Sequence, residues 1–265
     1  RKEFPGWSRP RFADSGWQAG TNGVGYETLV SGFAVRVVKA NVYVSDLETA
    51  DRVLSTPALQ VAVYGETAPV INYVNSGTGG NYAADRAVPG LVGDVEDYVI
   101  EATGTVTLPK SGNWTFGVHS DDGFRLEVGE HVLEYPDPRG PDASMDTFSF
   151  SKAGEYRLRL VYYARGGGSE VELWAASGWK WWWNANDFDL VGDTAKGGLA
   201  VVSTPVAGGG GTSYRPDIHT DVQSLMYNRQ VSAYVRLPFV VADPGVLESL
   251  TLKIISPSGS TYAYY

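Results

Sequence analysis

The sequence predicts an all-β protein built as an antiparallel β-sandwich with one short helix. Aromatic residues make up 12 % of the 265 residues, and the chain holds 32 Gly and 14 Pro. Aromatic and β-branched side chains suit a pleated, half-buried surface, whereas Gly and Pro mark tight turns. Stretches of alternating apolar residues recur along the chain, and helical spacing is convincing only once. We therefore expect many short strands joined by tight loops.

Alternation defines the expected strands. In the first, 33–45, the side chains of Phe33, Val35 and Val37 fall on one parity. Further strands are expected at 59–64, 70–74, 98–107, 113–119, 123–129, 147–150, 155–163, 170–175, 232–241 and 249–255. Residues 75–94 form a long Gly-rich excursion, which in a compact domain is usually functional or mobile.

One segment has the features of a helix. Ser45-Asp-Leu-Glu48 is typical of a capping box, in which the Ser hydroxyl and the Glu carboxylate satisfy free amides at a helix start. Apolar residues follow at helical spacing, namely Leu47, Ala50, Val53 and Leu54. Pro57 helps to end the segment. A helix over residues 46–55 is therefore expected.

Composition excludes several classes of function. With 21 basic and 30 acidic side chains the net charge is −9, so phosphate backbones repel the chain and no nucleic acid partner is expected. The carboxylates either keep the protein soluble or hold a hard cation such as calcium. The chain has no Cys, which excludes disulfides, thiolate metal sites and a Cys nucleophile. No apolar run reaches the ~20 residues of a membrane span.

The most specific pattern lies between Gly104 and Trp174. An alternating strand leads through Pro-Lys-Ser-Gly112 to an aromatic-rich strand, then to Ser120-Asp-Asp-Gly123 and a third strand. Further on, Gly154-Glu-Tyr opens another strand, and a Gly-rich loop precedes Glu170-Val-Glu-Leu-Trp174.

This succession resembles the 14-kilodalton protective-antigen domain, which is named from anthrax toxin and occurs in bacterial adhesins, yeast flocculins and glycosidases. The resemblance covers roughly residues 32–203 and implies a twisted β-sandwich. In lectin members of the family, two consecutive aspartates in a loop bind calcium, and the calcium binds vicinal hydroxyls of a sugar. The matching residues here are Asp121 and Asp122.

Adjacent carboxylates at a strand end supply hard anionic ligands for calcium, which takes about 6–8 oxygens. The alternative for Asp-Asp-Gly is an ordinary hairpin turn in which the Gly takes a positive φ. The loop that completes such sites in the family matches residues 165–169, which contain no Asn or Asp. Only its backbone and Ser169 are left to contact a ligand, so Gly167 and Ser169 are the expected ligand-binding residues there.

Two other segments are candidates for binding. In the Pro-rich loop 135–142, Asp137 and Arg139 contact a polar ligand or, alternatively, form a salt bridge within a rigid turn. A dense aromatic cluster favours a protein interface over a platform for sugar rings; it consists of Trp179, Trp181, Trp182 and Trp183.

Catalysis is not expected. His119 precedes Ser-Asp-Asp, so a Ser/His/Asp set is conceivable, but the sequence contains no nucleophile elbow, and His119 follows strand parity as an ordinary strand residue.

The two ends of the chain resemble consecutive pieces of one galactose-binding-like jelly roll of bacterial surface proteins. The resemblance rests on residues 12–26 and 233–252, and Gly208–Gly211 has the composition of a linker. It implies three segments: 1–31 and 208–265 as halves of a split, unfinished second β-sandwich, and 32–207 as the inserted protective-antigen-type sandwich. Because the chain starts at Arg1 without Met or signal peptide, we expect a piece of a longer protein.

Three functions follow from these expectations. The first is a non-catalytic, extracellular or cell-surface module that binds glycans, with calcium as its cofactor. The second is a structural subunit of an extracellular filament or surface assembly, self-associating through the chain ends and the Trp cluster. The third is an accessory domain of a polysaccharide-degrading enzyme.

Overall fold

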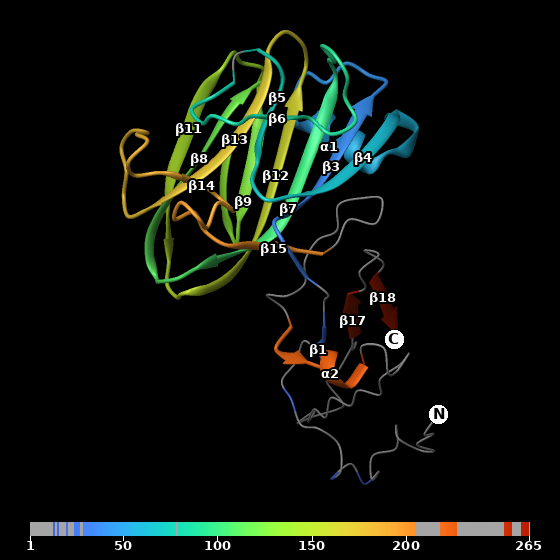
Figure 1. Cartoon of the computed structure of the whole chain (residues 1–265). Helices are drawn as coiled ribbons and strands as arrows, with labels where there is room; N and C mark the ends of the chain where they lie inside the picture. The colour runs from blue at the N-terminus through green and yellow to red at the C-terminus, as the bar shows by residue number, and fades with distance from the viewer. Residues whose placement is uncertain are drawn as a thin grey trace, which may run out of the picture. The chain divides into compact units, whose positions relative to one another are not determined.

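The chain divides into two compact units, Thr28–Pro216 and a unit composed of Arg1–Glu27 with Asp217–Tyr265 (Figure 1). The computed structural model describes residues 29–77, 79–204 and 218–226. It also describes Ala13, Ser15, Gly20 and residues 24–26, and the backbone of 252–255 and 261–264. No helix among these residues is long and apolar enough to cross a membrane.

The larger unit is a sandwich of two sheets, which confirms the all-β prediction (Figure 1). Among the described residues the first sheet has eight strands: β2 (Val30–Ser31), β3 (Phe33–Ala40), β4 (Gln60–Ala68), β7 (Tyr98–Leu108), β9 (Phe124–Val128), β10 (His131–Tyr135), β12 (Gly154–Ala164) and β15 (Val201–Ser203). The second has six: β5 (Asn72–Ser76), β6 (Arg86–Ala87), β8 (Gly112–Asp121), β11 (Asp142–Phe150), β13 (Ser169–Ser177) and β14 (Asp189–Leu190).

The strand order places β8 and β13 in the middle of the second sheet. The path of the first sheet runs β10-β9-β12-β7-β15-β2, with β3 between β7 and β4, and that of the second runs β11-β8-β13-β5-β6. Pairing is antiparallel except between β5 and β6. The chain leaves β8 and enters β9 through only Asp122 and Gly123, so it passes from one sheet to the other at this point.

Apolar side chains of one parity from both sheets form the core between them. Phe33, Val35 and Val37 lie there as expected, together with Phe116 and Val118 of β8. The strands β3, β7 and β12 also bury their other face, because the helix α1 (Leu47–Ser55) packs against it. A fully buried large apolar side chain contributes roughly 1.5–3 kcal/mol. Burial on both faces explains why these strands read as nearly continuous apolar runs.

The helix forms where the spacing predicts it, but its cap differs from the prediction. Asp46, rather than Ser45, is the N-cap residue: its carboxylate accepts a hydrogen bond from the Thr49 amide at 2.7 Å. Ser45 instead donates its hydroxyl to Asp46 at 2.9 Å. The capping box is therefore wrong by one residue, because the adjacent carboxylate is a charged acceptor and replaces the hydroxyl.

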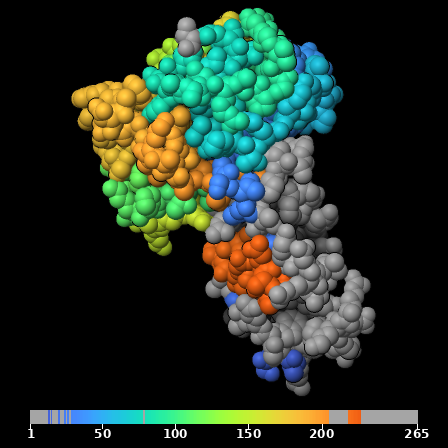
Figure 2. All heavy atoms as spheres, in the orientation of Figure 1, coloured from blue at the N-terminus to red at the C-terminus, as the bar shows by residue number. Residues whose placement is uncertain are grey.

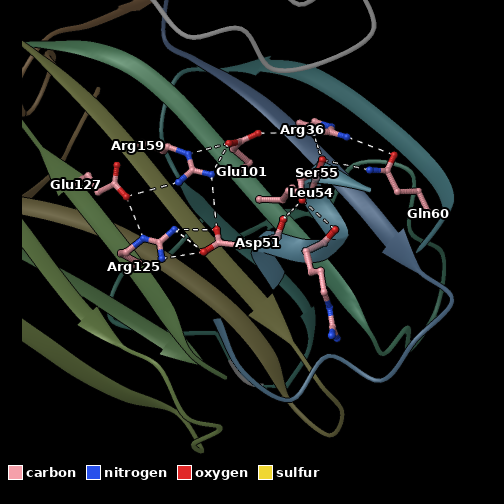
Figure 3. A network of polar contacts seen from close by, with 10 residues as sticks. Arg36, Asp51, Leu54, Ser55, Gln60, Glu101, Arg125, Glu127 and Arg159 are labelled. Atoms are coloured by element: carbon pink, nitrogen blue, oxygen red, sulfur yellow. Dashed lines mark hydrogen bonds and ion pairs between the residues drawn. The ribbon is translucent and has the colours of Figure 1, made fainter. Parts of the chain in front are cut away.

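Ion pairs attach α1 to the sheet beneath it (Figure 3). Asp51 accepts from both terminal nitrogens of Arg125, at distances of 2.8 and 3.0 Å. Arg125 also contacts Glu127, and Arg159 joins Glu101 at 2.8 Å. Each such pair at a half-exposed position contributes only about 0–1 kcal/mol, so the buried apolar face of α1 supplies most of the packing energy.

Two strands exceed the predictions. Strand β10 was not expected, and β11 begins at Asp142 although only residues 147–150 were predicted. The extra residues of β11, 142–146, are exposed or half-buried, and they pair with β8 from Ser120 downward. Backbone pairing with a buried neighbour thus extends this strand beyond the residues 147–150 that were predicted.

The smaller unit contains few described elements. Strand β1 (Val24–Gly25) pairs in parallel with β16 (Thr220–Asp221), so residues far apart in sequence are neighbours there. A four-residue helix, α2 (Gln223–Met226), follows, and β17 (Leu252–Ile255) pairs with β18 (Thr261–Tyr264). The expected strand 232–241 lies outside the described residues. The split jelly roll, with boundaries at 31/32 and 207/208, stays a prediction.

The cap assignment can be tested by substitution. Asp46→Ala should destabilise the protein by about 0.5–2 kcal/mol, whereas Ser45→Ala should cost a few tenths. The Thr49 amide lowers the pKa of Asp46. Its stabilising contribution is therefore present above the unfolded value of about 3.9 and is lost as pH falls through the lower folded-state value. Urea unfolding at pH 7 measures both variants, and equal losses would contradict the assignment.

Candidate functional site

The two consecutive aspartates lie where the chain crosses between the sheets. Asp121 ends β8 and Asp122 follows it through a cis peptide bond. Both residues are buried, with 6 % and 3 % of their surface exposed. Gly123 does not have a positive φ, so the hairpin alternative is wrong. Glycine is required here for close approach, because a Cβ would lie 2.6 Å from the Tyr135 carbonyl oxygen.

Hydrogen bonds from three elements fix this crossing. The Arg165 amide donates to Asp122 Oδ2 at 2.7 Å, and the Ser120 hydroxyl donates to the Asp122 carbonyl at 2.7 Å. The Tyr162 hydroxyl, from β12 in the other sheet, donates to the Asp121 carbonyl. The crossing therefore connects the two sheets and the loop after β12.

The Pro-rich loop is attached to the same end of the sandwich through Arg139. This guanidinium donates to Ser120 Oγ at 3.0 Å and to Ser144 Oγ at 2.7 Å, and it lies 4.6 Å from the centre of the Tyr135 ring. Asp137 is exposed, and its backbone carbonyl faces Gly123. Arg139 thus holds the loop in place, and a salt bridge between Asp137 and Arg139 is not among the ion pairs of the described residues.

The Gly-rich loop 165–168 lies next to both aspartates. Gly167 has a φ of +83° and open space around its Cα, whereas a Cβ on Gly168 would lie 2.6 Å from Asp121 Oδ2. Ser169 is buried at the start of β13, opposite Ser76 of β5. A side chain at position 168 would therefore collide with the Asp121 carboxylate, and ligand binding by Gly167 and Ser169 stays a prediction.

Two further carboxylates lie beside the aspartate pair, and sequence reasoning missed them. Register places Glu170 directly opposite Asp121 and Glu172 opposite His119, all on the outer face of the second sheet. Glu172 accepts from the amides of Asn81 and Tyr82, at 2.8 and 2.7 Å. The alternation in Glu170-Val-Glu172 indicates that the two glutamates share a face of the strand. Only the register shows that this face lies beside Asp121 and His119 of β8.

Unlike Glu172, Glu170 accepts no hydrogen bond from the described residues. Its side chain is 1 % exposed, and neither carboxylate oxygen has a hydrogen bond among the described residues. His119 Nδ1 lies 3.2 Å from Oε1 without hydrogen-bond geometry. Burial lowers the pKa of His119, which disfavours a charged imidazolium beside Glu170.

Burial raises the pKa of all four acids at this end. That of Asp121 is raised to about 6 by burial and then by the charges of Asp122 and Glu170. The pKa of Asp122 is raised by burial and partly restored by the Arg165 amide. Burial likewise raises the pKa of Glu170 and of Glu172. The site concentrates negative charge in a desolvated position, an arrangement that favours a bound cation.

Comparison with known proteins identifies the family of the larger unit. Residues 55–187, half of the chain, match the PA14 domain. The chain belongs to the PA14 domain family. The solved PA14 domain of the MpAFP antifreeze protein is 17 % identical, covers 74 % of this chain and 99 % of its own length, and gives a TM-score of 0.50. No curated protein matches the chain in sequence.

Two adhesin domains are more distantly similar in structure. The PA14 sugar-binding domain from an RTX adhesin is 17 % identical, covers 61 % of this chain and 94 % of its own, and gives a TM-score of 0.44. The Epithelial Adhesin 9 A domain from Candida glabrata, solved with Galb1-4GlcNAc, is 12 % identical, covers 72 % and 99 %, and gives 0.41.

The donor set of this PA14 domain fits calcium. Asp121 and Asp122 supply carboxylate oxygens at a crossing held rigid by three hydrogen bonds, and Glu170 is a buried carboxylate without a partner. Oxygen-only donors suit a hard cation. Within the described residues no three His, Cys, Asp or Glu side chains are grouped as a metal-ligand set. Backbone oxygens and water therefore have to complete any coordination shell here.

The Trp cluster of this PA14 domain lies at the other end of the second sheet. Ser177, which precedes it, pairs with Trp114 near the start of β8, roughly 24 Å along the strand from Glu170. Trp179, Trp181 and Trp182 are 59 %, 76 % and 67 % exposed, on a segment that projects from the side of the sandwich (Figure 2). Trp183 turns inward against Tyr82, with ring centres 6.0 Å apart.

The raised pKa of Asp121 predicts how the metal-free protein responds to pH. The folded-state pKa of Asp121, about 6, exceeds the unfolded value of about 3.9, so the folded state binds the proton more tightly. The stabilising contribution of protonated Asp121 is therefore fully present below pH ~4. This contribution, roughly 3 kcal/mol, is lost as pH rises through 6. Urea unfolding in EDTA at pH 4.5 to 7 should show Asp121→Asn gaining stability relative to the native chain as pH rises. A constant difference between the two would refute the shift.

Proposed function

We propose that this chain is a non-catalytic, calcium-dependent carbohydrate-binding module of an extracellular or cell-surface protein. One observation carries the proposal: two adjacent carboxylates, Asp121 and Asp122, are buried and rigidly held at a loop end of a PA14 sandwich. They are the positions that match the calcium-binding aspartates of lectins in this family. Leaving two charges buried side by side is costly unless a cation accompanies them.

The chemistry follows from the preference of calcium for many oxygen ligands. A calcium ion held by the aspartate pair keeps coordination positions that water occupies, and vicinal hydroxyls of a sugar replace that water at little cost. The loops 136–141 and 165–168 flank the pair and limit which sugars fit. Arg139 keeps its loop in place through Ser120 and Ser144, so it acts by positioning the rim.

The residues around His119 support a non-catalytic role. His119 and Ser120 are consecutive on β8, so their side chains point to opposite faces of the sheet. His119 lies beside Glu170, whereas the Ser120 hydroxyl donates to the Asp122 carbonyl and accepts from Arg139. A nucleophile and its base have to be within hydrogen-bond reach of each other, and these two are not.

The proposal is tested by removing the two charges. Asp121→Asn with Asp122→Asn should abolish calcium uptake in calorimetry, because neutral amides are far weaker ligands than carboxylates. Calcium-dependent binding on a glycan array should disappear with it. The matched control removes two exposed carboxylates elsewhere, Asp146→Asn with Glu130→Gln, and should bind calcium and glycans as the native chain does.

Two results would reject the proposal. The native chain, freed of metal with EDTA, takes up no calcium when titrated, or it binds glycans equally well with calcium and with EDTA. Equal glycan binding with calcium and with EDTA would mean that the chain binds carbohydrate without needing calcium.

A second candidate function is assembly with another copy of the chain, which the exposed Trp cluster favours. The rings of Trp179 and Trp181 lie 5.4 Å apart, and three large apolar side chains face solvent within four residues. Aromatic side chains grouped this way are typical of interfaces. Because the Trp cluster lies far from Asp121 along the strands, the aromatic surface and the acidic site do not overlap.

Replacing Trp179, Trp181 and Trp182 by Ala should therefore lower the sedimentation coefficient at high protein concentration and leave calcium uptake unchanged. Val92→Ala, at a 91 % exposed apolar position, is the control. A native chain that sediments as a monomer at every concentration would eliminate self-association, and a loss of glycan binding in the Trp variant would instead assign the cluster to sugars.

A further inference from the structure

A carboxylate without a partner requires a physical explanation. Glu170 is 1 % exposed on the side chain and has no hydrogen bond to either oxygen among the described residues, whereas Glu172, on the same strand and face, has two. Leaving a buried charge unpaired is among the larger penalties that a fold can carry. The contrast indicates that something outside the chain interacts with Glu170.

Among the described residues, no Lys or Arg forms an ion pair with Glu170. His119 Nδ1 lies 3.2 Å from Glu170 Oε1 but without hydrogen-bond geometry, and Glu172, the next side chain of β13 on the same face, is itself acidic. The Gly79 amide faces the carboxylate without reaching hydrogen-bond geometry and offers only a partial charge.

Register brings this charge to the aspartate pair. Glu170 lies directly opposite Asp121 on neighbouring antiparallel strands, where Cβ atoms on the same face are about 4.5–5.5 Å apart. Gly168 leaves room for the Asp121 carboxylate, since a Cβ there would lie 2.6 Å from Asp121 Oδ2.

We propose that Glu170 is the third anionic group of the Asp121/Asp122 calcium site, and that the bound calcium is the counter-charge that its buried carboxylate lacks. This inference rests on the proposed function. Because no three acids in the described part of the chain are grouped as direct ligands, Glu170 acts through a bridging water and through its charge. It is a positioning residue of the site rather than a ligand.

The proposal predicts an unusual pair of effects from one substitution. Glu170→Gln should weaken calcium binding about tenfold, because a neighbouring unit charge no longer attracts the divalent ion. The same variant should be more stable than the native chain in EDTA, with a higher Tm, because it removes an unpaired buried charge. Its amide also lies where it can donate to the unpartnered His119 Nδ1.

Two controls separate this from general damage to the strand. Glu172→Gln makes the same change two residues further along, but it replaces an acceptor of two amide hydrogen bonds, so it should lower the Tm in EDTA. Glu130→Gln removes one exposed charge at the far end of the sandwich and should change neither quantity. Glu170→Asp keeps the charge and should retain calcium affinity within about threefold.

Calorimetry with calcium and thermal unfolding in EDTA decide the outcome. Calcium uptake by the native chain with unchanged affinity in Glu170→Gln would overturn this inference and leave the proposed function intact. A lower Tm of Glu170→Gln in EDTA would also overturn it, since the carboxylate would then have a stabilising partner in the metal-free protein. No calcium uptake by the native chain would overturn both.

Discussion

The passage of the chain from β8 to β9 is the constraint on which the candidate site depends. Two residues, Asp122 and Gly123, span the distance between the sheets, so their neighbours have no freedom to move away. Gly123 packs against the loop after β10, and the Asp122 carboxylate accepts from the amide that begins the loop after β12. A hydroxyl from the opposite sheet holds the Asp121 carbonyl. The same short crossing therefore closes the sandwich and fixes the two carboxylates.

The apolar core stabilises the sandwich, whereas the buried acids at the crossing destabilise it. The core and the face under α1 are apolar and continuous, and they supply most of the folding energy. At the crossing, burial raises the pKa of each acid, and the charges of Asp122 and Glu170 raise that of Asp121 further, so ionising these acids destabilises the metal-free fold. A protein whose stability is typically only about 5–15 kcal/mol tolerates such a cluster only because the core is extensive. Binding a cation in this position relieves the repulsion.

How much of this follows from the sequence depends on how local each interaction is. The helix follows from apolar spacing within 46–55, whereas its cap moves to Asp46 because two adjacent residues both offer acceptors. In residues 142–146 of β11, the apolar side chains Ala143 and Met145 lie on the opposite parity to the core residues Phe148 and Phe150, so it is pairing with β8 that continues the strand there. Asp121 and Asp122 can be selected from the chemistry of adjacent carboxylates. Glu170 cannot, because its role depends on which residue lies opposite it on another strand.

The two ends of β13 explain why one small sandwich can present two unlike surfaces. At the Ser169 end, strand register places Glu170 opposite Asp121, next to a Gly-rich loop in which Gly168 leaves room for the Asp121 carboxylate. At the Ser177 end, the strand leaves the sheet into a segment where Trp183 packs inward on Tyr82 and anchors the segment, while its neighbours stay exposed. A rigid antiparallel strand, which rises about 3.4 Å per residue, keeps the ends apart. Occupation of the acidic end therefore leaves the aromatic end accessible, so the two proposed functions do not exclude each other.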